Sequence, residues 1–249
     1  MSLFNTLTTQ GLEDAQDRLG GFQPLESDIY TGIIKAAYAG KSSGGAVSVT
    51  FLIEMDGKEY RETFYVTNKK GENFFLNKQD NSKKVPLPGF TLVDDICLVT
   101  TDKPLSMQDH EDKVIKVYDA DAKKELPKSV PMLVDLIGKE VSLGILKSIV
   151  NKNEKVGNEY VPTAETREEN TTDKVFHTET KMTVVELKNE KTEPAFWNGW
   201  LERNKGNTRD KRTVKDGVAG ASATAPKAGN SAAPAANAPA RTSLFGKKS

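Results

Sequence analysis

The stretch that decides the fold is KEYRETFYVTNKKGENFF, Lys58–Phe75. Its first part alternates with a period of two, which is typical of a β-strand. The two faces of this strand carry Tyr60, Glu62, Phe64 and Val66 on one side, and Arg61, Thr63, Tyr65 and Thr67 on the other. We expect Tyr60 and Phe64 to belong to the core, because they share their face with Val66.

The opposite face carries both a cation, Arg61, and an aromatic ring, Tyr65. Aromatic rings can stack on bases while cations neutralise phosphates, which suits single-stranded nucleic acid. A sheet with one wet face and ordinary surface charges would give the same pattern. Both interpretations stay open on this strand alone.

Two more strands precede this one. Asp28–Ala39 is long and largely apolar, and Ala46–Met55 alternates cleanly. Gly40–Gly45 is a turn, and Asp56-Gly57 is a strong hairpin signal. With Lys58–Asn68 as the third strand, the sequence predicts a three-stranded meander.

The chain after the meander is expected to hold one helix and then two strands of the barrel. Helical spacing predicts a helix over Gly89–Thr101. The remaining expected pieces are a possible strand at Lys113–Tyr118, a strand at Glu140–Asn151, a long polar loop over 152–178, a last strand at Met182–Leu187 and an amphipathic piece at Glu193–Asn204. Three strands, a helix and two strands is the order of an OB-fold, a five-stranded partly open barrel. We therefore expect a β-rich fold of this kind.

The expected division of the chain has four parts. Residues 1–24 are an N-terminal arm, and 25–190 form the OB-fold domain, enlarged by a helix-containing insertion from Gly71 to Ile137. Residues 191–216 are a short amphipathic and basic segment. Residues 217–249 are rich in Ala, Pro, Gly, Asn and Ser, a composition that predicts a disordered tail ending in an interaction motif.

The formal net charge of zero hides an asymmetry along the chain. From Arg203 to the end there are ten Lys and Arg residues against Asp210 and Asp216, so this part is +8 and the remainder −8. An acidic body with a basic arm suggests an anionic partner, or a tail that folds back on its own body.

The sequence offers no catalytic or metal-binding set, so we expect neither an enzyme nor a cofactor. Cys97 is the only cysteine and lies in an apolar run, and His110 and His177 show no ligand spacing. No apolar run approaches the ~20 residues that span a membrane. The N-terminus lacks a signal-peptide pattern, which indicates an intracellular protein.

Three runs of this chain carry a family resemblance: IIKAAYAGKSSGG, KEYRETFYVTNKKGENFF and GFTLVDDICLVTTDKPL. Together they resemble the single-stranded DNA-binding protein of N-four-like podoviruses, from about residue 25 to the C-terminus. The resemblance implies a protein that coats single-stranded DNA in phage replication and recombination, in the cytoplasm of the bacterial host. It also implies contact with other phage replication proteins, and a C-terminal segment that contacts host RNA polymerase and activates late transcription. Lys247 and Lys248 match the lysines of that segment, whereas the final Ser249 is a small departure.

The expected DNA site is a groove on the first three strands. Its residues are Lys35, Arg61, Lys69 and Lys70 for phosphates, Tyr65 and either Phe74 or Phe75 for stacking, and Tyr38 and Lys41 along one end. Phe74 and Phe75 have an alternative role as a cap on the barrel core.

The expected partner-binding motif lies at the far end of the tail. Its residues are Leu244, Phe245, Lys247 and Lys248, an apolar pair beside two cations. That composition suits a groove with an acidic rim. The alternative is a solvated tail that adds only nonspecific DNA affinity.

Three other functions fit the same features, and an oligosaccharide-binding sheet protein is one of them. An RNA-binding OB-fold protein is the nearest, because stacking does not distinguish the two sugars. A transcription activator that does not need DNA is the third, and it predicts that changes at Arg61 and Tyr65 are silent.

Overall fold

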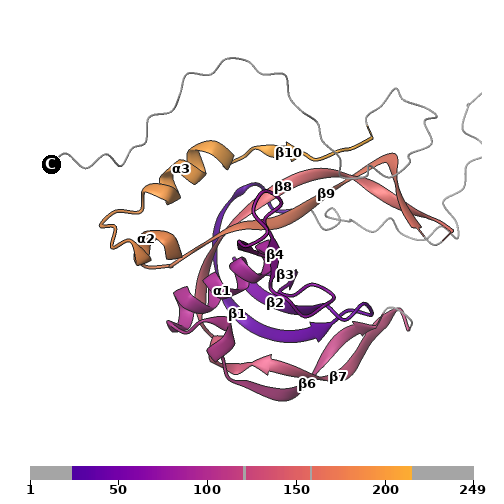
Figure 1. Cartoon of the computed structure of the whole chain (residues 1–249), viewed down its shortest axis with the longest axis horizontal. Coiled ribbons are helices and arrows are strands. Elements are labelled where there is room, and N and C mark those ends of the chain that lie inside the picture. Colours follow the sequence, from indigo (N-terminus) through magenta and orange to yellow (C-terminus); the bar gives the residue numbers. More distant parts are fainter. Residues whose placement is uncertain (1–23, 120–121, 158, 215–249) are drawn as a thin grey trace, which may run out of the picture.

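The computed structural model of this protein describes residues 24–119, 122–157 and 159–214 (Figure 1). The expected N-terminal arm up to residue 23 and the tail from residue 215 lie outside the described residues. The strands within these ranges form one eight-stranded sheet and a separate two-stranded hairpin, so the fold is β-rich as expected. The strands are β1 Asp28–Lys41, β2 Val47–Met55, β3 Lys58–Tyr65, β4 Phe74–Leu76, β5 Lys84–Pro86, β6 His110–Asp119, β7 Lys124–Leu133, β8 Glu140–Val156, β9 Glu159–Phe176 and β10 Thr208–Asp210. The helices are α1 Pro88–Thr101, α2 Val184–Lys188 and α3 Ala195–Asn204, with short 3-10 turns at Leu105–Met107 and Val134–Leu136.

The predicted meander is confirmed, with β1, β2 and β3 paired antiparallel. Asp56 and Gly57 connect β2 to β3 with φ angles of 49° and 73°, the two positive values that a type I′ hairpin turn needs. The third strand ends at Tyr65, earlier than expected. Beyond it the side chain of Asn68 accepts hydrogen bonds from the backbone N–H groups of Lys70 and Glu72, which holds the chain in a turn.

The long strand β1 serves two different neighbours on one edge. Its first half, Asp28–Ile33, pairs antiparallel with β8. After a register shift between Ile34 and Ala36, Tyr38 pairs with Met132 of β7. Two hairpins, β8–β9 and β6–β7, therefore leave the same strand, and Figure 1 shows both reaching away from the meander.

The expected polar loop over 152–178 is wrong, because Glu159–Phe176 is strand β9. It pairs with β8 along nearly its whole length, from Ser142↔Phe176 to Val156↔Glu159. Eight of the 18 residues of β9 are exposed, and its buried residues, Thr172, Val175 and Phe176, all lie near its end. A strand of this kind has no apolar alternation to reveal it, and backbone pairing with β8 alone decides it.

The expected strand at Met182–Leu187 is also wrong, because Val184–Lys188 is helix α2. Thr183 and Glu186 form a capping box, in which each side chain accepts a hydrogen bond from the other residue's backbone N–H. This satisfies N–H groups that a first helical turn leaves open. The box outweighs the β-propensity of the two valines.

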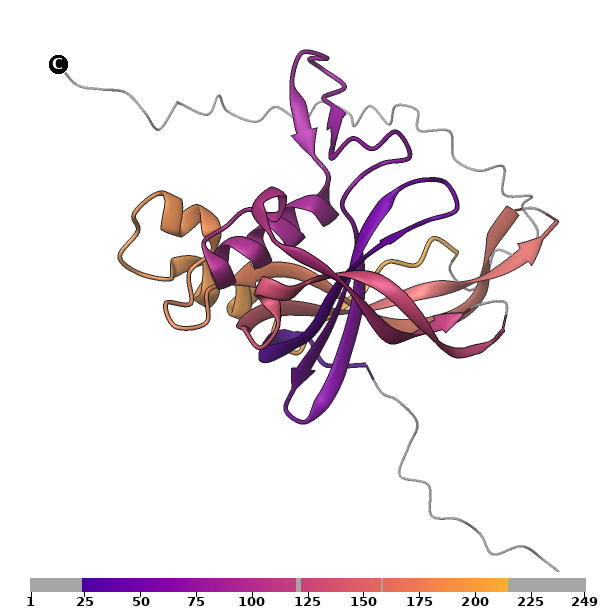
Figure 2. The same cartoon turned by 90° about the horizontal axis from the view of Figure 1, so that it is seen from below.

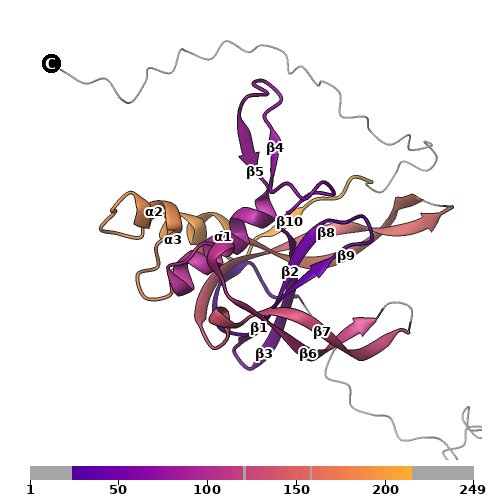
Figure 3. The ribbon, with the colours of Figure 1, turned by 60° about the horizontal axis from the view of Figure 1, so that its bottom comes forward.

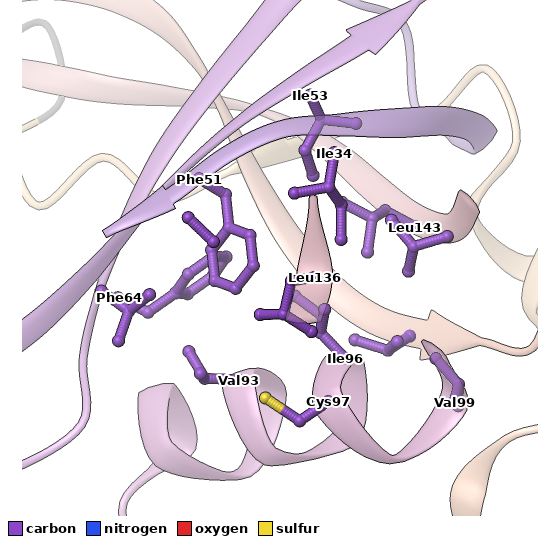
Figure 4. Packing of buried hydrophobic residues seen from close by; sticks show 14 of the residues in the cluster. Ile34, Phe51, Ile53, Phe64, Val93, Ile96, Cys97, Val99, Leu136 and Leu143 are labelled. Atoms are coloured by element: carbon purple, nitrogen blue, oxygen red, sulfur yellow. The ribbon is translucent and has the colours of Figure 1, made fainter. Parts of the chain in front are cut away.

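The main core lies between the inner face of the meander and helix α1 (Figure 4). Tyr60 and Phe64 are 9% and 6% exposed, so their expected place in the core is confirmed. Phe64 packs edge-on against Phe51, with ring centroids 5.9 Å apart. Gly89 lets the first turn of α1 reach β3, since a Cβ there would lie 2.4 Å from the carbonyl oxygen of Tyr65.

The side chain of Cys97 is fully buried in this core, on α1. Burial raises the pKa of its thiol to about 12. The thiol is therefore protonated at neutral pH and is a packing group, as the sequence indicated.

Both tryptophans pack on the sheet rather than projecting from it. Trp200 of α3 is buried with Leu146 and Phe176 of β8 and β9, and Trp197 packs against the same cluster. The indole N–H of Trp200 donates to Asp173 at 2.8 Å. Helix α3 and strand β10, which pairs parallel with β8, thus extend the body beyond residue 190.

Candidate nucleic-acid interface

The candidate interface begins with the outer side of the meander, the side turned away from α1. The strand registers place three rows of side chains across it: Ala36, Leu52 and Arg61; Tyr38, Thr50 and Thr63; and Gly40, Ser48 and Tyr65. The hydroxyls of Thr50 and Thr63 are hydrogen bonded at 2.8 Å. This side of the meander therefore combines small, hydroxyl, cationic and aromatic groups.

The guanidinium of Arg61 is held in place by Tyr38. One N–H of Arg61 donates to the Tyr38 hydroxyl at 2.9 Å, and the Arg61 side chain is exposed. Guanidinium carries five N–H groups, so others are left to reach an anion. Arg61 thus lies exposed on the side of β3 that the sequence predicted for it.

The expected role of Tyr38 along the end of a groove needs correction. Its side chain is only 5% exposed and packs with Ala36, Val130 and Met132. Burial leaves its ring no face for a base. Tyr38 instead positions Arg61 through its hydroxyl.

Tyr65 is the exposed ring on this side of the meander, with 53% of its surface accessible. It lies at the end of β3 in the row of Gly40 and Ser48, neither of which covers it with a large side chain. Its backbone is held by the close approach of Gly89. The ring is thus presented from a fixed point, which suits stacking.

Three of the predicted lysines gather beyond the end of the meander. A Cβ added at Gly44 would lie 3.1 Å from Cε of Lys69, and one added at Gly45 would lie 3.5 Å from the Lys69 carbonyl oxygen and 4.0 Å from Cε of Lys41. The 41–46 turn and the 66–72 turn therefore lie side by side. Lys70 is exposed on the second of them.

The hairpin β4–β5 projects from the body near the start of α1 (Figure 3). Phe74 is half-buried under the ammonium of Lys84, 4.3 Å from its ring centroid, while Phe75 is 47% exposed. Neither ring belongs to the main core, so the alternative role as a core cap is wrong. Phe75 is the one whose ring is open to a ligand.

Lys35 differs from the other predicted cations because it has a partner. Its ammonium lies 2.7 Å from the carboxylate of Glu54, and both side chains are about half exposed. An exposed pair of this kind contributes little stability and can exchange partners. A phosphate at this position would have to compete with Glu54.

The sequence reasoning missed the lysines of the β6–β7 hairpin. Lys113 and Lys128 share a hairpin face with Ile115, since Lys113 pairs with Val130 and Ile115 with Lys128. This hairpin face continues the outer side of the meander, because Met132 pairs with Tyr38. The alternation in KVIKVY, residues 113–118, was the available signal. The ammonium of Lys113 forms an ion pair with the carboxylate of Glu111, at 3.1 Å.

Two of these parts form one surface, which we name the outer face: the three rows that end with Tyr65 and the hairpin face of Lys128. The turns that carry Lys41 and Lys69 lie beyond its end, where Lys41 pairs with Val47 and so lies, by register, on the side of the core. Figure 2 shows the molecule from below, with the β6–β7 and β8–β9 hairpins leaving the body on the same side. The predicted motif at Leu244, Phe245, Lys247 and Lys248 lies outside the described residues.

No model of a known protein family matches this chain, and no curated protein matches it in sequence. No described helix is long and apolar enough to cross a membrane. Within residues 24–119, 122–157 and 159–214, no group of three or more His, Cys, Asp and Glu side chains is placed to hold a metal ion.

Proposed function

We propose that this protein binds single-stranded DNA along the outer face. The observation that carries the proposal is the pair on β3: an exposed Arg61 guanidinium fixed by Tyr38, and an exposed Tyr65 ring on the same face. A cation for phosphate beside a ring for a base is the minimal unit of sequence-tolerant single-strand binding.

We also propose that the barrel is an OB-fold. The chain order β1, β2, β3, α1, β8, β9 and the pairing of β1 with β8 support this, with β4–β5 inserted before α1 and β6–β7 after it. In the described residues β3 and β9 share no backbone ladder, but the Glu62 side chain bonds to Thr172 between them. A partly open barrel of this type binds oligonucleotides on the face that the β2 and β3 strands provide.

In this proposal each group has a separate task. Tyr65 stacks on one base, and Phe75 on the projecting hairpin offers a second ring. Arg61 binds a phosphate. Lys41, Lys69 and Lys70 bind further phosphates of the DNA where it passes the end of the meander. None of these contacts reads a base edge, so binding is tolerant of sequence.

The wider role that we propose comes from the resemblance. The protein would coat single-stranded DNA during phage replication and recombination in the host cytoplasm. The segment with Leu244, Phe245, Lys247 and Lys248 would contact host RNA polymerase to activate late transcription. The basic tail and its apolar pair support a protein contact of this kind.

The test is the affinity of the full chain for oligo-dT after Tyr65→Ala and Arg61→Ala, one at a time. Loss of one stacked base costs ~1–3 kcal/mol, so Tyr65→Ala is expected to weaken binding about 5- to 150-fold. Tyr118→Ala is the matched control, since Tyr118 is 55% exposed and lies on the opposite face of the β6–β7 hairpin. Unchanged affinity in both β3 variants would remove the outer face from the proposal.

Competition between single-stranded DNA, RNA of the same sequence and duplex DNA separates the alternatives. Preference for single-stranded DNA is expected. Preference for RNA would make this an RNA-binding protein, and absence of any nucleic-acid binding would favour an activator that works without DNA. The logarithm of affinity should fall by roughly 0.7 per unit of log salt for each phosphate neutralised.

A further inference from the structure

A cavity of about 750 Å³ lies apart from the outer face, among α1, α2, α3, β9 and β10. Its apolar walls are Val175, Val185, Phe196 and Trp200. Val185 and Phe196 are 65% and 43% exposed, so apolar surface continues from the cavity to the outside of the molecule. A cavity of this size holds one or two large side chains of a peptide.

Two of the acidic groups at this cavity are already bonded. Glu186 accepts hydrogen bonds from the backbone N–H groups of Thr183 and Phe196. Asp173 accepts from the indole of Trp200, and Arg209 lies 3.7 Å away from it. These groups hold α2, α3 and β10 together.

The carboxylate of Asp95 on α1 is different. Among the described residues it makes no hydrogen bond and no ion pair, although it lines the cavity and is partly buried. Lys174 and Lys188 act on it only at longer range, and burial is the larger influence, raising its pKa to about 6. An unpaired carboxylate beside apolar walls favours a ligand that brings both an apolar side chain and a cation.

We propose that the last residues of this same chain, RTSLFGKKS at 241–249, dock in this cavity. Leu244 and Phe245 would occupy the apolar walls, and the ammonium of Lys247 or Lys248 would pair with Asp95. The segment has the two features that the cavity requires, two residues apart in sequence. The cavity lining itself is balanced in charge, because Lys174, Arg203 and Arg209 lie in it together with three carboxylates, so the ionic contact of the segment is the one with Asp95.

The chain leaves the described residues close to the cavity. Arg209 lines the cavity, and Val214, five residues later, is fixed by its backbone contacts with the Asn151 side chain. Five extended residues span at most about 17 Å. The tether of about 30 residues from there to Leu244 has a root-mean-square span of roughly 30 Å as a flexible chain, which is enough to return.

A tryptophan at the mouth of the cavity makes the docking measurable. Trp200 is already only 4% exposed, so Phe196→Trp, at a cavity position that is 43% exposed, serves as the reporter in every protein compared. The experiment compares acrylamide quenching of tryptophan fluorescence in the full chain and in the full-length double variant Leu244→Ser/Phe245→Ser. We expect the variant to lose protection, with a higher quenching constant and a red-shifted emission. A synthetic RTSLFGKKS peptide added to the variant should restore the wild-type values.

Two further variants keep the outcome clear. Thr242→Ala/Ser243→Ala changes the same segment outside the apolar pair and should behave as wild type. Asp95→Asn should lose protection as the double variant does, and the peptide should not restore it. Equal quenching in the wild type and the Leu244→Ser/Phe245→Ser variant would overturn the proposal.

Protection that grows with protein concentration would also overturn it, because docking would then join different molecules. The test needs neither DNA nor RNA polymerase, so it stands or falls independently of the proposed function.

Discussion

The carboxylate of Glu62 on β3 accepts hydrogen bonds from both the backbone N–H and the hydroxyl of Thr172 on β9, at 3.0 and 2.6 Å. The hydroxyl of Tyr60 donates to the same carboxylate at 2.6 Å. Burial, and then the charge of Glu62, raise the pKa of Tyr60, so the phenol keeps the proton that it donates. One side chain thus joins two strands that are 110 residues apart.

Replacing this carboxylate should destabilise the protein. Glu62→Ala leaves the donors of Tyr60 and Thr172 without their partner in a largely buried place, and each buried unsatisfied group costs ~1–3 kcal/mol. We expect a loss of about 2–4 kcal/mol in urea unfolding, with the sum reduced by water that enters the gap. Glu59→Ala, an exposed glutamate of the same strand, is the control and should stay within ~0.5 kcal/mol of wild type.

Tyr38→Phe tests whether Tyr38 acts through Arg61. Removing the hydroxyl frees the guanidinium, and we expect oligo-dT affinity to fall by a factor of ~2–10, the value of one ordinary hydrogen bond. In an Arg61→Ala background the same change should have no further effect on affinity. Additive losses in the double variant would mean that Tyr38 contributes to binding by another route.

The two phenylalanines of the β4–β5 hairpin should behave differently. Phe75→Ala removes an exposed ring, so stability should change by less than ~0.5 kcal/mol while oligo-dT affinity falls. Phe74→Ala removes the ring beneath Lys84 and should lower stability slightly, by ~0.5–1 kcal/mol. Thermal unfolding and fluorescence titration of the two variants check this. An affinity loss confined to Phe74→Ala would show that Phe74, and not Phe75, contacts the DNA.

Asp95 gives the folding stability a specific pH dependence. Its pKa is raised from the ordinary value to about 6, so the folded protein binds a proton here more tightly than the unfolded chain does. The stability due to this proton is fully present below pH ~4 and is lost as the pH rises through about 6. In the Leu244→Ser/Phe245→Ser background, where no tail lysine pairs with Asp95, Asp95→Asn should therefore be more stable than its parent at pH 8, by the order of 1 kcal/mol after allowance for solvent screening, and equal to it near pH ~4.

Urea unfolding of both proteins from about pH 4 to about pH 8 measures this difference. A constant difference across the range would show that Asp95 does not titrate in it. Asp94→Asn is a poor control because its carboxylate holds the N–H of Leu105, so Asp102→Asn at the end of α1 is preferable.

Much of the framework could be predicted from the residues. The alternation in Ala46–Met55 and Lys58–Asn68 predicted two strands and the correct inward face, because a strand with one buried side shows the period of its pleat. The spacing of Leu92, Val93, Ile96 and Val99 predicted α1, because a helix with one buried face repeats its apolar residues every three or four positions. In the candidate site, the side of β3 that carries Arg61 and Tyr65 was predicted correctly, because alternate residues of a strand point to the same side.

Other parts depended on neighbours that the sequence does not name. Strand β9 carries little apolar alternation, and its ladder with β8 exists only because β8 lies beside it. Tyr38 lies on the same side of the meander as Arg61. It is nevertheless buried, because the β6–β7 hairpin covers its part of that side. Lys35 meets Glu54 only across the β1–β2 pairing.

The sequence by itself determined which side of each meander strand is apolar, since that depends on residue order and a period of two. The tertiary structure decided which parts of the outer face stay open, because coverage depends on elements distant in the chain. Lys58–Phe75 contains examples of both: local order determined that Tyr60 and Phe64 face the core, whereas the exposure of Tyr65 and Phe75, 53% and 47%, depends on which other elements pack around them.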